Sequence, residues 1–170
     1  WTASSTAAID SCWNRLSDYV SGSSQYPYVS TSYSLSSNKS VYMYSTATTY
    51  SALILPPFAT SMDSLQISFG LYKTTTGSYP IQVGVMVDPS DISTFTAVAT
   101  VDASQGYRWQ MFEIPLNGYT GSGKYIALVS PNGTSSYPYL DNVEVNLIPT
   151  CPRVYDVEVS GITQTSAYVS

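Results

Sequence analysis

The chain of 170 residues contains no histidine and only six lysines and arginines, against eleven aspartates and glutamates. Without histidine, the sequence lacks the base that activates a serine or cysteine nucleophile in the common catalytic triads. The net charge of −5 argues against binding to a phosphate backbone, which requires clustered lysine and arginine side chains. We therefore expect no catalytic residues, no enzyme activity and no nucleic-acid partner.

Long hydrophobic runs are also missing. No apolar segment reaches the roughly 18 residues that a membrane-spanning helix needs, so we expect no insertion into a membrane. Charged residues make up only 10% of the chain, against about 25% in an average soluble domain, whereas serine, threonine and tyrosine are abundant. This neutral, hydroxyl-rich composition indicates a protein that works outside the cytoplasm, either secreted or on a cell surface.

Only two cysteines are present, Cys12 and Cys151, and their spacing matches neither a Cys-x-x-Cys motif nor a zinc site. If the first and last strands of the fold lie side by side, a disulfide between these cysteines would contribute about 4 to 5 kcal/mol in the chain-entropy model. The alternative is two separate thiols, with Cys12 buried as a small hydrophobic residue. The sequence leaves both interpretations open.

Short segments with alternating apolar and polar residues fill the chain from residue 40 onward, most clearly at 65–72 and 81–87. Turn residues separate these segments. The pattern predicts an all-β fold, an antiparallel β-sandwich of about eight to ten strands. The one helical turn that we expect lies near Ser90–Thr94, where Asp88 and Asp91 are suited to capping.

The segment 139–147 places a carboxylate in an apolar pattern. Regular strand alternation gives one face the residues Tyr139, Asp141, Val143, Val145 and Leu147. A carboxylate buried on such a face must be paired, hydrogen-bonded or bound to a metal. Because cationic side chains are scarce, we consider a calcium ion held by oxygen ligands, or hydrogen bonds from backbone amides or from tyrosine or serine hydroxyls.

Asp141 and Glu144 are candidates for the carboxylate pair of a glycosidase, because both belong to one expected strand. A spacing of three residues directs the two side chains to opposite faces of a regular strand, so that they cannot flank one glycosidic bond. We therefore expect no catalysis from this pair.

The sixteen tyrosines are the most distinctive feature of the composition. Tyrosine packs well on strands, and its ring also stacks on sugars or peptides while the hydroxyl forms hydrogen bonds. The better candidates for ligand binding are the tyrosines beside turn prolines, namely Tyr26, Tyr28, Tyr137 and Tyr139. Tyr42, Tyr44 and Tyr125 are expected to fill strand surfaces, and this role is the alternative for the other four as well.

The composition changes at residues 148–152, where two prolines flank Cys151. We predict a first domain over residues 1–148, in which Ile9–Trp13 begins the first strand. A linker and the truncated start of a second domain follow over residues 149–170, because the residues after Pro152 are too few to build a core of their own.

Five motifs occur in order between residues 9 and 147: DSCW at 10–13, KSVYMY at 39–44, VGVMVDPSD at 83–91, GKYIA at 123–127 and YLDNV at 139–143. Together they resemble the cleaved-adhesin modules, MAM-like jelly rolls found in the haemagglutinin regions of gingipains and in other secreted or surface proteins of Bacteroidetes-type bacteria. Residues 151–170 resemble the opening strands of a fibronectin type III domain.

The resemblance implies a jelly-roll sandwich with an adhesive, non-catalytic role, often with a structural calcium near the first and last strands. Asp10 and Asp141 match acidic positions of the family and are the metal ligands that the resemblance implies. The sequence departs from the family at Asn142, where a second aspartate is frequent, and the missing charge would weaken a calcium site.

From these observations we expect a non-catalytic module that serves adhesion or binds a ligand, either a glycan or a host surface protein. The module would belong to a larger bacterial protein, secreted or displayed on the cell surface, in which it is covalently linked to neighbouring domains. The alternative function is that of a structural spacer, which presents neighbouring domains and has no ligand of its own.

Overall fold

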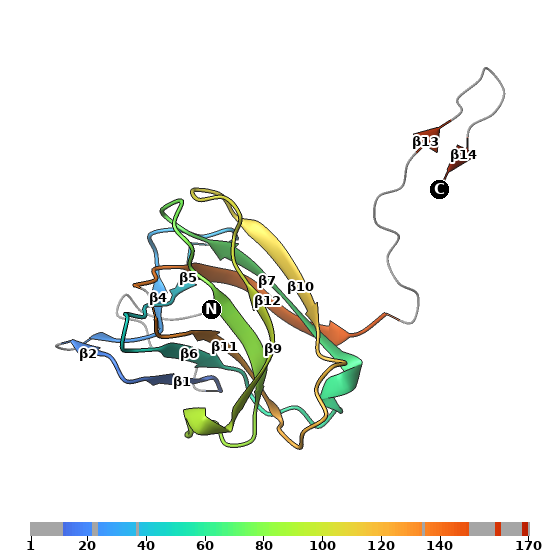
Figure 1. Cartoon of the computed structure of the whole chain (residues 1–170), viewed down its shortest axis with the longest axis horizontal. Coiled ribbons are helices and arrows are strands. Elements are labelled where there is room, and N and C mark those ends of the chain that lie inside the picture. Colours follow the sequence, from blue (N-terminus) through green and yellow to red (C-terminus); the bar gives the residue numbers. More distant parts are fainter. Residues whose placement is uncertain are drawn as a thin grey trace.

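Two antiparallel sheets, each of five strands, face one another in the computed structural model of this chain (Figure 1). The structure describes residues 12–21, 24–36, 38–133 and 135–149, together with the backbone of Val159–Ser160 and Tyr168–Val169. The predicted all-β, antiparallel sandwich is therefore confirmed.

The first sheet has the strand order β1-β6-β11-β8-β9. Its strands are β1 (Asn14–Ser17), β6 (Ser51–Ile54), β11 (Tyr125–Ser130), β8 (Ile81–Met86) and β9 (Phe95–Val101). Strand β1 begins at Asn14, so the prediction that Cys12 and Trp13 belong to a strand is wrong, whereas Ile9, Asp10 and Ser11 lie outside the described residues. Trp13 lies outside the strand, and its half-buried side chain packs against the hydrophobic core.

The second sheet has the strand order β10-β7-β12-β5-β4. Its strands are β10 (Gln110–Pro115), β7 (Leu65–Tyr72), β12 (Tyr139–Leu147), β5 (Ser40–Tyr42) and β4 (Tyr28–Ser30). Because β12 lies at the centre of this sheet, side chains on its outer face have neighbours on both sides.

Short elements complete the structure. Strands β2 (Val20–Ser21) and β3 (Ser24–Gln25) pair with each other, as do β13 (Val159–Ser160) and β14 (Tyr168–Val169). The expected helical turn is confirmed as a 3-10 helix, η2 (Ile92–Thr94), and a second, η1 (Met62–Ser64), was not expected. The predicted caps are also confirmed, since Asp91 Oδ1 accepts from Ser93 N and Asp88 Oδ1 from Ser90 N.

The core fills the space between the two sheets. The alternating residues of β7 and β8 supply much of it, namely Leu65, Ile67, Phe69, Leu71, Ile81, Val83 and Val85. Removing such a side chain from water stabilises the fold by about 1.5 to 3 kcal/mol. Because every second residue of β7 points into this core, the residues between them point to the outer face of the second sheet.

Strand β12 does not keep a regular alternation. Asp141 pairs with Gly70 and Glu144 with Ser68, so three steps along β12 match two steps along β7. The extra residue is a β-bulge at which Asn142 adopts φ 51°, in the left-handed region that asparagine tolerates better than most residues. Before the bulge it is Leu140 that faces the core; after it, Val143 does.

The bulge corrects two predictions. Asp141 lies with Tyr139 on the outer face, not among Val143 and Val145, because the extra residue reverses the alternation between them. Glu144 then returns to the same outer face as Asp141, so the expectation that these two carboxylates point to opposite faces is wrong.

The predicted domain boundary at 148–149 stays a prediction. Residues 150–158 and 161–167 lie outside the described part of the chain, and so does the resemblance of the C-terminal segment to a fibronectin type III domain.

Candidate ligand-binding face

Three Tyr-x-Tyr motifs lie on neighbouring segments of the second sheet: Tyr26-Pro27-Tyr28, Tyr42-Met43-Tyr44 and Tyr137-Pro138-Tyr139. Residues two apart on a strand point to the same face, and the middle residue of each motif is buried on the other side. All six tyrosines therefore lie on the outer face of this sheet.

The strand register aligns one tyrosine from each of four strands into a row. Tyr42 of β5 pairs with Tyr28 of β4 and with Tyr139 of β12, and Tyr139 in turn pairs with Tyr72 of β7. The successive ring centroids are 5.3, 4.8 and 6.2 Å apart. Trp109, which immediately precedes β10, ends the row with its ring centroid 5.3 Å from that of Tyr72. The row therefore crosses the whole sheet.

A second row runs beside the first. The ring centroid of Tyr44 lies 4.9 Å from that of Tyr26 and 5.4 Å from that of Tyr137. The ring centroids of Tyr137 and Tyr79 are 5.7 Å apart. Tyr19 packs against Tyr44 at 4.7 Å. We call the two rows the aromatic face, made of Tyr26, Tyr28, Tyr42, Tyr44, Tyr72, Tyr79, Trp109, Tyr137 and Tyr139. Each ring pair contributes about 0.5 to 1.5 kcal/mol beyond its buried area.

The pKa values of two central phenols of the aromatic face, Tyr139 and Tyr42, are raised. Burial, and next the nearby phenols of Tyr28 and Tyr33, raise the pKa of Tyr139 to about 12. Burial also raises the pKa of Tyr42 well above its usual value, with Tyr139 as the next cause. The aromatic face therefore presents neutral rings with hydroxyl groups that both donate and accept hydrogen bonds.

Loop 31–36 lies on the outer face beside the first row. The Asp141 carboxylate holds it there, because Oδ2 accepts from the backbone N–H groups of Leu35 at 2.7 Å and Ser36 at 3.0 Å. Oδ1 accepts from Asn142 N at 2.8 Å. Asp141 is only 1% exposed, and these three bonds satisfy its buried charge.

Beneath Leu35 of this loop the sheet has a glycine, Gly70. A Cβ at Gly70 would lie 2.9 Å from Leu35 Cδ2 and 3.1 Å from Trp109 Cε3, so only glycine lets the loop pack this closely. The loop also carries Tyr33, whose ring stacks on that of Tyr72 at 4.8 Å and contacts that of Tyr139 at 5.0 Å. The loop therefore extends the aromatic face along one side.

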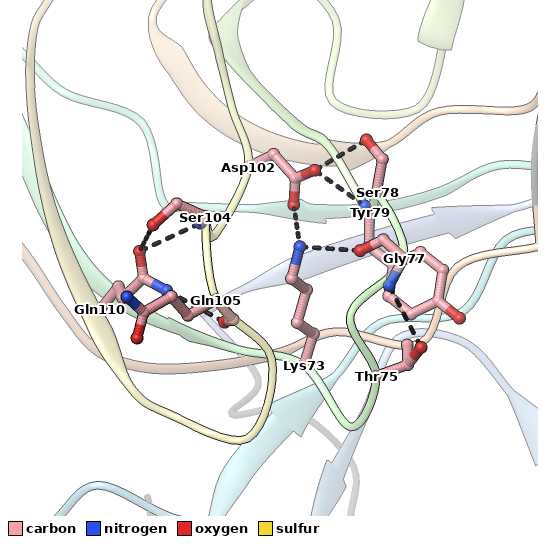
Figure 2. Close-up of polar contacts among 9 residues, drawn as sticks. All are labelled: Lys73, Thr75, Gly77, Ser78, Tyr79, Asp102, Ser104, Gln105 and Gln110. Carbon is pink, nitrogen blue, oxygen red and sulfur yellow. Dashed lines mark hydrogen bonds and ion pairs between the residues drawn. The ribbon is translucent and has the colours of Figure 1, made fainter.

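An ion pair fixes the loops at the other end of the face (Figure 2). Lys73 Nζ, on a side chain only 4% exposed, lies 3.1 Å from Asp102 Oδ1 and donates to Gly77 O at 2.7 Å. Asp102 Oδ2 accepts from Ser78 Oγ at 2.7 Å and from Tyr79 N at 3.1 Å. The pair therefore joins the β7–β8 loop, which carries Tyr79, to the segment that leads to Trp109.

A hollow of about 570 Å³ opens on the same sheet. Its lining includes Gln66, Ser68, Met111, Glu113, Glu144 and Asn146. Gln66 Nε2 donates to Glu113 Oε1 at 2.5 Å. Glu113 and Glu144 both flank Ser68, and this negative charge makes the outer face unfavourable for anions near the hollow.

The structure brings the four predicted tyrosines together, although Tyr26 and Tyr28 are far in sequence from Tyr137 and Tyr139. That they bind a ligand stays a prediction. Tyr42 and Tyr44, expected only to fill strand surface, occupy the centre of the same cluster. The signal that places them there is the repeated Tyr-x-Tyr spacing. Tyr72 and Trp109 carry no such signal, because the pairing of β7 with β12 and β10 decides their position.

The geometry around Asp141 does not fit a calcium ligand. N–H groups point their positive ends at both of its oxygens, which suits the carboxylate but disfavours a cation beside it. Among the described residues, no group of three or more His, Cys, Asp or Glu side chains is placed to hold a metal. Asp10 lies outside the described residues, so its role as a calcium ligand stays a prediction.

The cysteine predictions are resolved only for Cys12. Cys12 is exposed, so the expectation that it is buried as a small hydrophobic residue is wrong. The strand begins two residues later, which leaves Cys12 at the surface end of the sandwich. Cys151 lies outside the described residues, and a disulfide between the two stays a prediction.

None of the helices in the described part of the chain has the length and apolar character needed to cross a membrane. Comparison with models of protein families gives no match, and neither does comparison with curated proteins. Solved structures do match, at low sequence identity.

The K2 cleaved adhesin domain of Lys-gingipain superposes with a TM-score of 0.62 and 14% identity, over 85% of this chain and 92% of that domain. The K1 cleaved adhesin domain of Lys-gingipain from Porphyromonas gingivalis W83 gives 0.59 and 16%, over 83% and 94%. A family 30 carbohydrate-binding module gives 0.52 and 11%, over 78% and 79%. The expected resemblance is confirmed for the fold: this chain has the β-sandwich of the cleaved adhesin domains.

Proposed function

We propose that this chain is a non-catalytic module that binds glycans through the aromatic face of its second sheet. The observation that carries the proposal is the alignment of three Tyr-x-Tyr motifs and Trp109 across that sheet. A core needs no such arrangement, because these rings lie outside it and most are only partly buried. We further propose that the module works outside the cell, in agreement with its neutral, hydroxyl-rich composition.

The chemistry of the face favours sugars. A sugar ring presents an apolar face of C–H groups that stacks on an aromatic ring, while its hydroxyls form hydrogen bonds with groups at the ring edge. Tyrosine supplies both in one side chain, and its two χ angles cost little entropy when it becomes fixed. The rings here are already packed against one another, so that binding needs little further ordering.

A glycan array followed by fluorescence titration tests the proposal, since Trp109 lies on the face and reports its occupation. We expect Tyr28→Ala to reduce the binding affinity at least tenfold. Trp109→Phe should weaken or abolish the change in fluorescence emission on binding. The matched control is Val87→Ala, an exposed hydrophobic residue just beyond β8 in the first sheet. Flat responses to every glycan would favour the alternative function, a structural spacer. Binding to an immobilised host surface protein, with no binding to any glycan, would show that the ligand is a protein.

A further inference from the structure

We infer that the ligand is a linear, uncharged glycan of about four or more sugar units that lies across the strands, with loop 31–36 along one side. This inference rests on the proposed function and specifies its ligand class. It follows from three properties of the aromatic face: its direction, its charge and its boundary.

The direction of the face is set by the strand ladder. The first row takes one ring from each of the five strand positions, from Tyr28 at β4 to Trp109 at β10. Neighbouring strands are about 4.8 Å apart, so the row is about 19 Å long. An extended pyranose chain advances by about one strand spacing per sugar, so a chain of four or five sugars spans the row. Tyr28, Tyr42 and Trp109 are the partly exposed rings that it would contact, because Tyr139 is buried and Tyr33 covers Tyr72.

The members of the aromatic face carry no positive charge that would favour an acidic sugar along most of its length. Its members are tyrosines and one tryptophan, none of which is a cation. Lys73, next to Tyr72 in sequence, is buried and engaged by Asp102 and Gly77 O. Arg15 donates to Pro27 O at 3.3 Å at the other end. Arg108 precedes Trp109 and is exposed, which leaves one end of the row within reach of a cation.

The boundary of the face is loop 31–36, which follows the row across the sheet. Leu35 lies over Gly70 and near Trp109, and Tyr33 stacks on Tyr72. Both side chains are 40% exposed and stand above the sheet. A branch that points toward the loop collides with them, and Asp141 prevents the loop from moving aside. The site therefore selects chains without branches on that side.

A length series tests the inference. The probes are cello-oligosaccharides and manno-oligosaccharides of two to six units, with oligogalacturonides of equal length as the acidic arm and xylose-branched gluco-oligosaccharides as the branched arm. We expect calorimetric affinity for one neutral series to rise at least tenfold between two and four or five units and then to level off. The acidic and branched probes should bind at least tenfold more weakly than the matched neutral chain.

Variants locate the chain on the row. Tyr28→Ala and Trp109→Ala remove opposite ends, so each should lower affinity for the five-unit chain at least fivefold and for the two-unit chain by a smaller factor. Tyr33→Ala shortens the boundary and should raise affinity for the branched probe relative to the linear one. Val87→Ala is the control for all three.

The outcomes separate the inference from the proposed function. Absence of binding to every neutral, acidic and branched probe overturns the glycan-binding function itself. Binding whose affinity stops rising at two units, or that favours the oligogalacturonides, overturns the inference and leaves the function in place. Equal affinity for linear and branched probes, unchanged in Tyr33→Ala, overturns the boundary assigned to loop 31–36.

Discussion

The Asp141 carboxylate accepts a hydrogen bond from the backbone N–H of Leu35 at 2.7 Å, across 106 residues of sequence. This bond, with those from Ser36 and Asn142, gives a buried charge on a central strand three backbone donors. It also fixes the loop that borders the aromatic face. A single side chain therefore links the stability of β12 to the shape of the candidate site.

Replacing Asp141 tests this link. Asp141→Ala leaves the N–H groups of Leu35, Ser36 and Asn142 without this acceptor, and we expect it to lower the free energy of unfolding by about 2 to 4 kcal/mol. Asp141→Asn keeps one acceptor oxygen and should cost about half as much. Asp63→Ala, an exposed carboxylate in η1, is the control and should change stability by less than about 0.5 kcal/mol. Urea denaturation measures all three.

The same variants test the calcium site implied by the family resemblance. Because backbone N–H groups satisfy Asp141, we expect the cost of Asp141→Ala to be the same with calcium and with chelator. Stabilisation of the wild type by calcium that disappears in Asp141→Ala would show instead that Asp141 holds the ion.

Two glycines should respond differently to alanine. At Gly70 the new Cβ meets the ends of side chains, with Leu35 Cδ2 at 2.9 Å, whereas at Gly84 it meets Thr96 O of the backbone at 2.2 Å. We expect Gly70→Ala to cost about 1 kcal/mol, because Leu35 can adjust, and Gly84→Ala about 3 kcal/mol or more. Thermal denaturation compares them. Equal losses of stability in the two variants would mean that the backbone of β9 moves to accommodate the new Cβ as readily as the side chain of Leu35 does.

Alkaline pH should destabilise the protein through its buried phenols. The pKa of Tyr139 is raised from 10.0 to about 12 by burial, and that of Tyr42 is also raised, so the folded state retains protons that the unfolded state releases. Their contribution is complete below pH 10 and is lost as the pH rises from about 10 through 12. Denaturation at pH 8 and pH 11 should show the loss, and Tyr139→Phe should reduce it. A profile that is flat to pH 12 would contradict the burial of these hydroxyls.

The Lys73–Asp102 pair offers a test of how the loops at the end of the face are held. Lys73→Met keeps the apolar stem and removes the buried ammonium, so that Asp102 Oδ1 and Gly77 O lose this donor, while Asp102 Oδ2 keeps Ser78 and Tyr79. Because Asp102 is 28% exposed and solvent screens its charge, we expect a loss of only about 1 to 3 kcal/mol. The exposed Lys124→Met is the matched control, with an expected change below about 0.5 kcal/mol. Tyr79 should become more mobile in Lys73→Met, measurable by hydrogen exchange at its amide.

Local patterns predicted the strands well where one face is buried. The segments 65–72 and 81–87 alternate strictly because every second side chain must enter the core, and they form β7 and β8. The cap at Asp91 is also a local feature, since its partner lies two residues away. The prediction that Trp13 belongs to a strand failed because aromatic residues are typical of strands, whereas Trp13 precedes β1 and packs against the core.

The candidate site was only half visible in the sequence. The prolines drew attention to Tyr26, Tyr28, Tyr137 and Tyr139, but the spacing shared with Tyr42 and Tyr44 was the stronger signal. The position of Asp141 was mispredicted because alternation assumes a regular strand. A bulge depends on the hydrogen bonds available from a neighbouring strand and loop, and no pattern within 139–147 contains that information.

The sequence by itself determined that this chain forms an antiparallel sandwich with neutral, tyrosine-rich surfaces, because period-two alternation and composition are properties of neighbouring residues. The tertiary structure alone decided which tyrosines form one face and which side of β12 carries Asp141. Both depend on the register between strands that are far apart in the chain, and a shift of one residue in a strand exchanges its two faces.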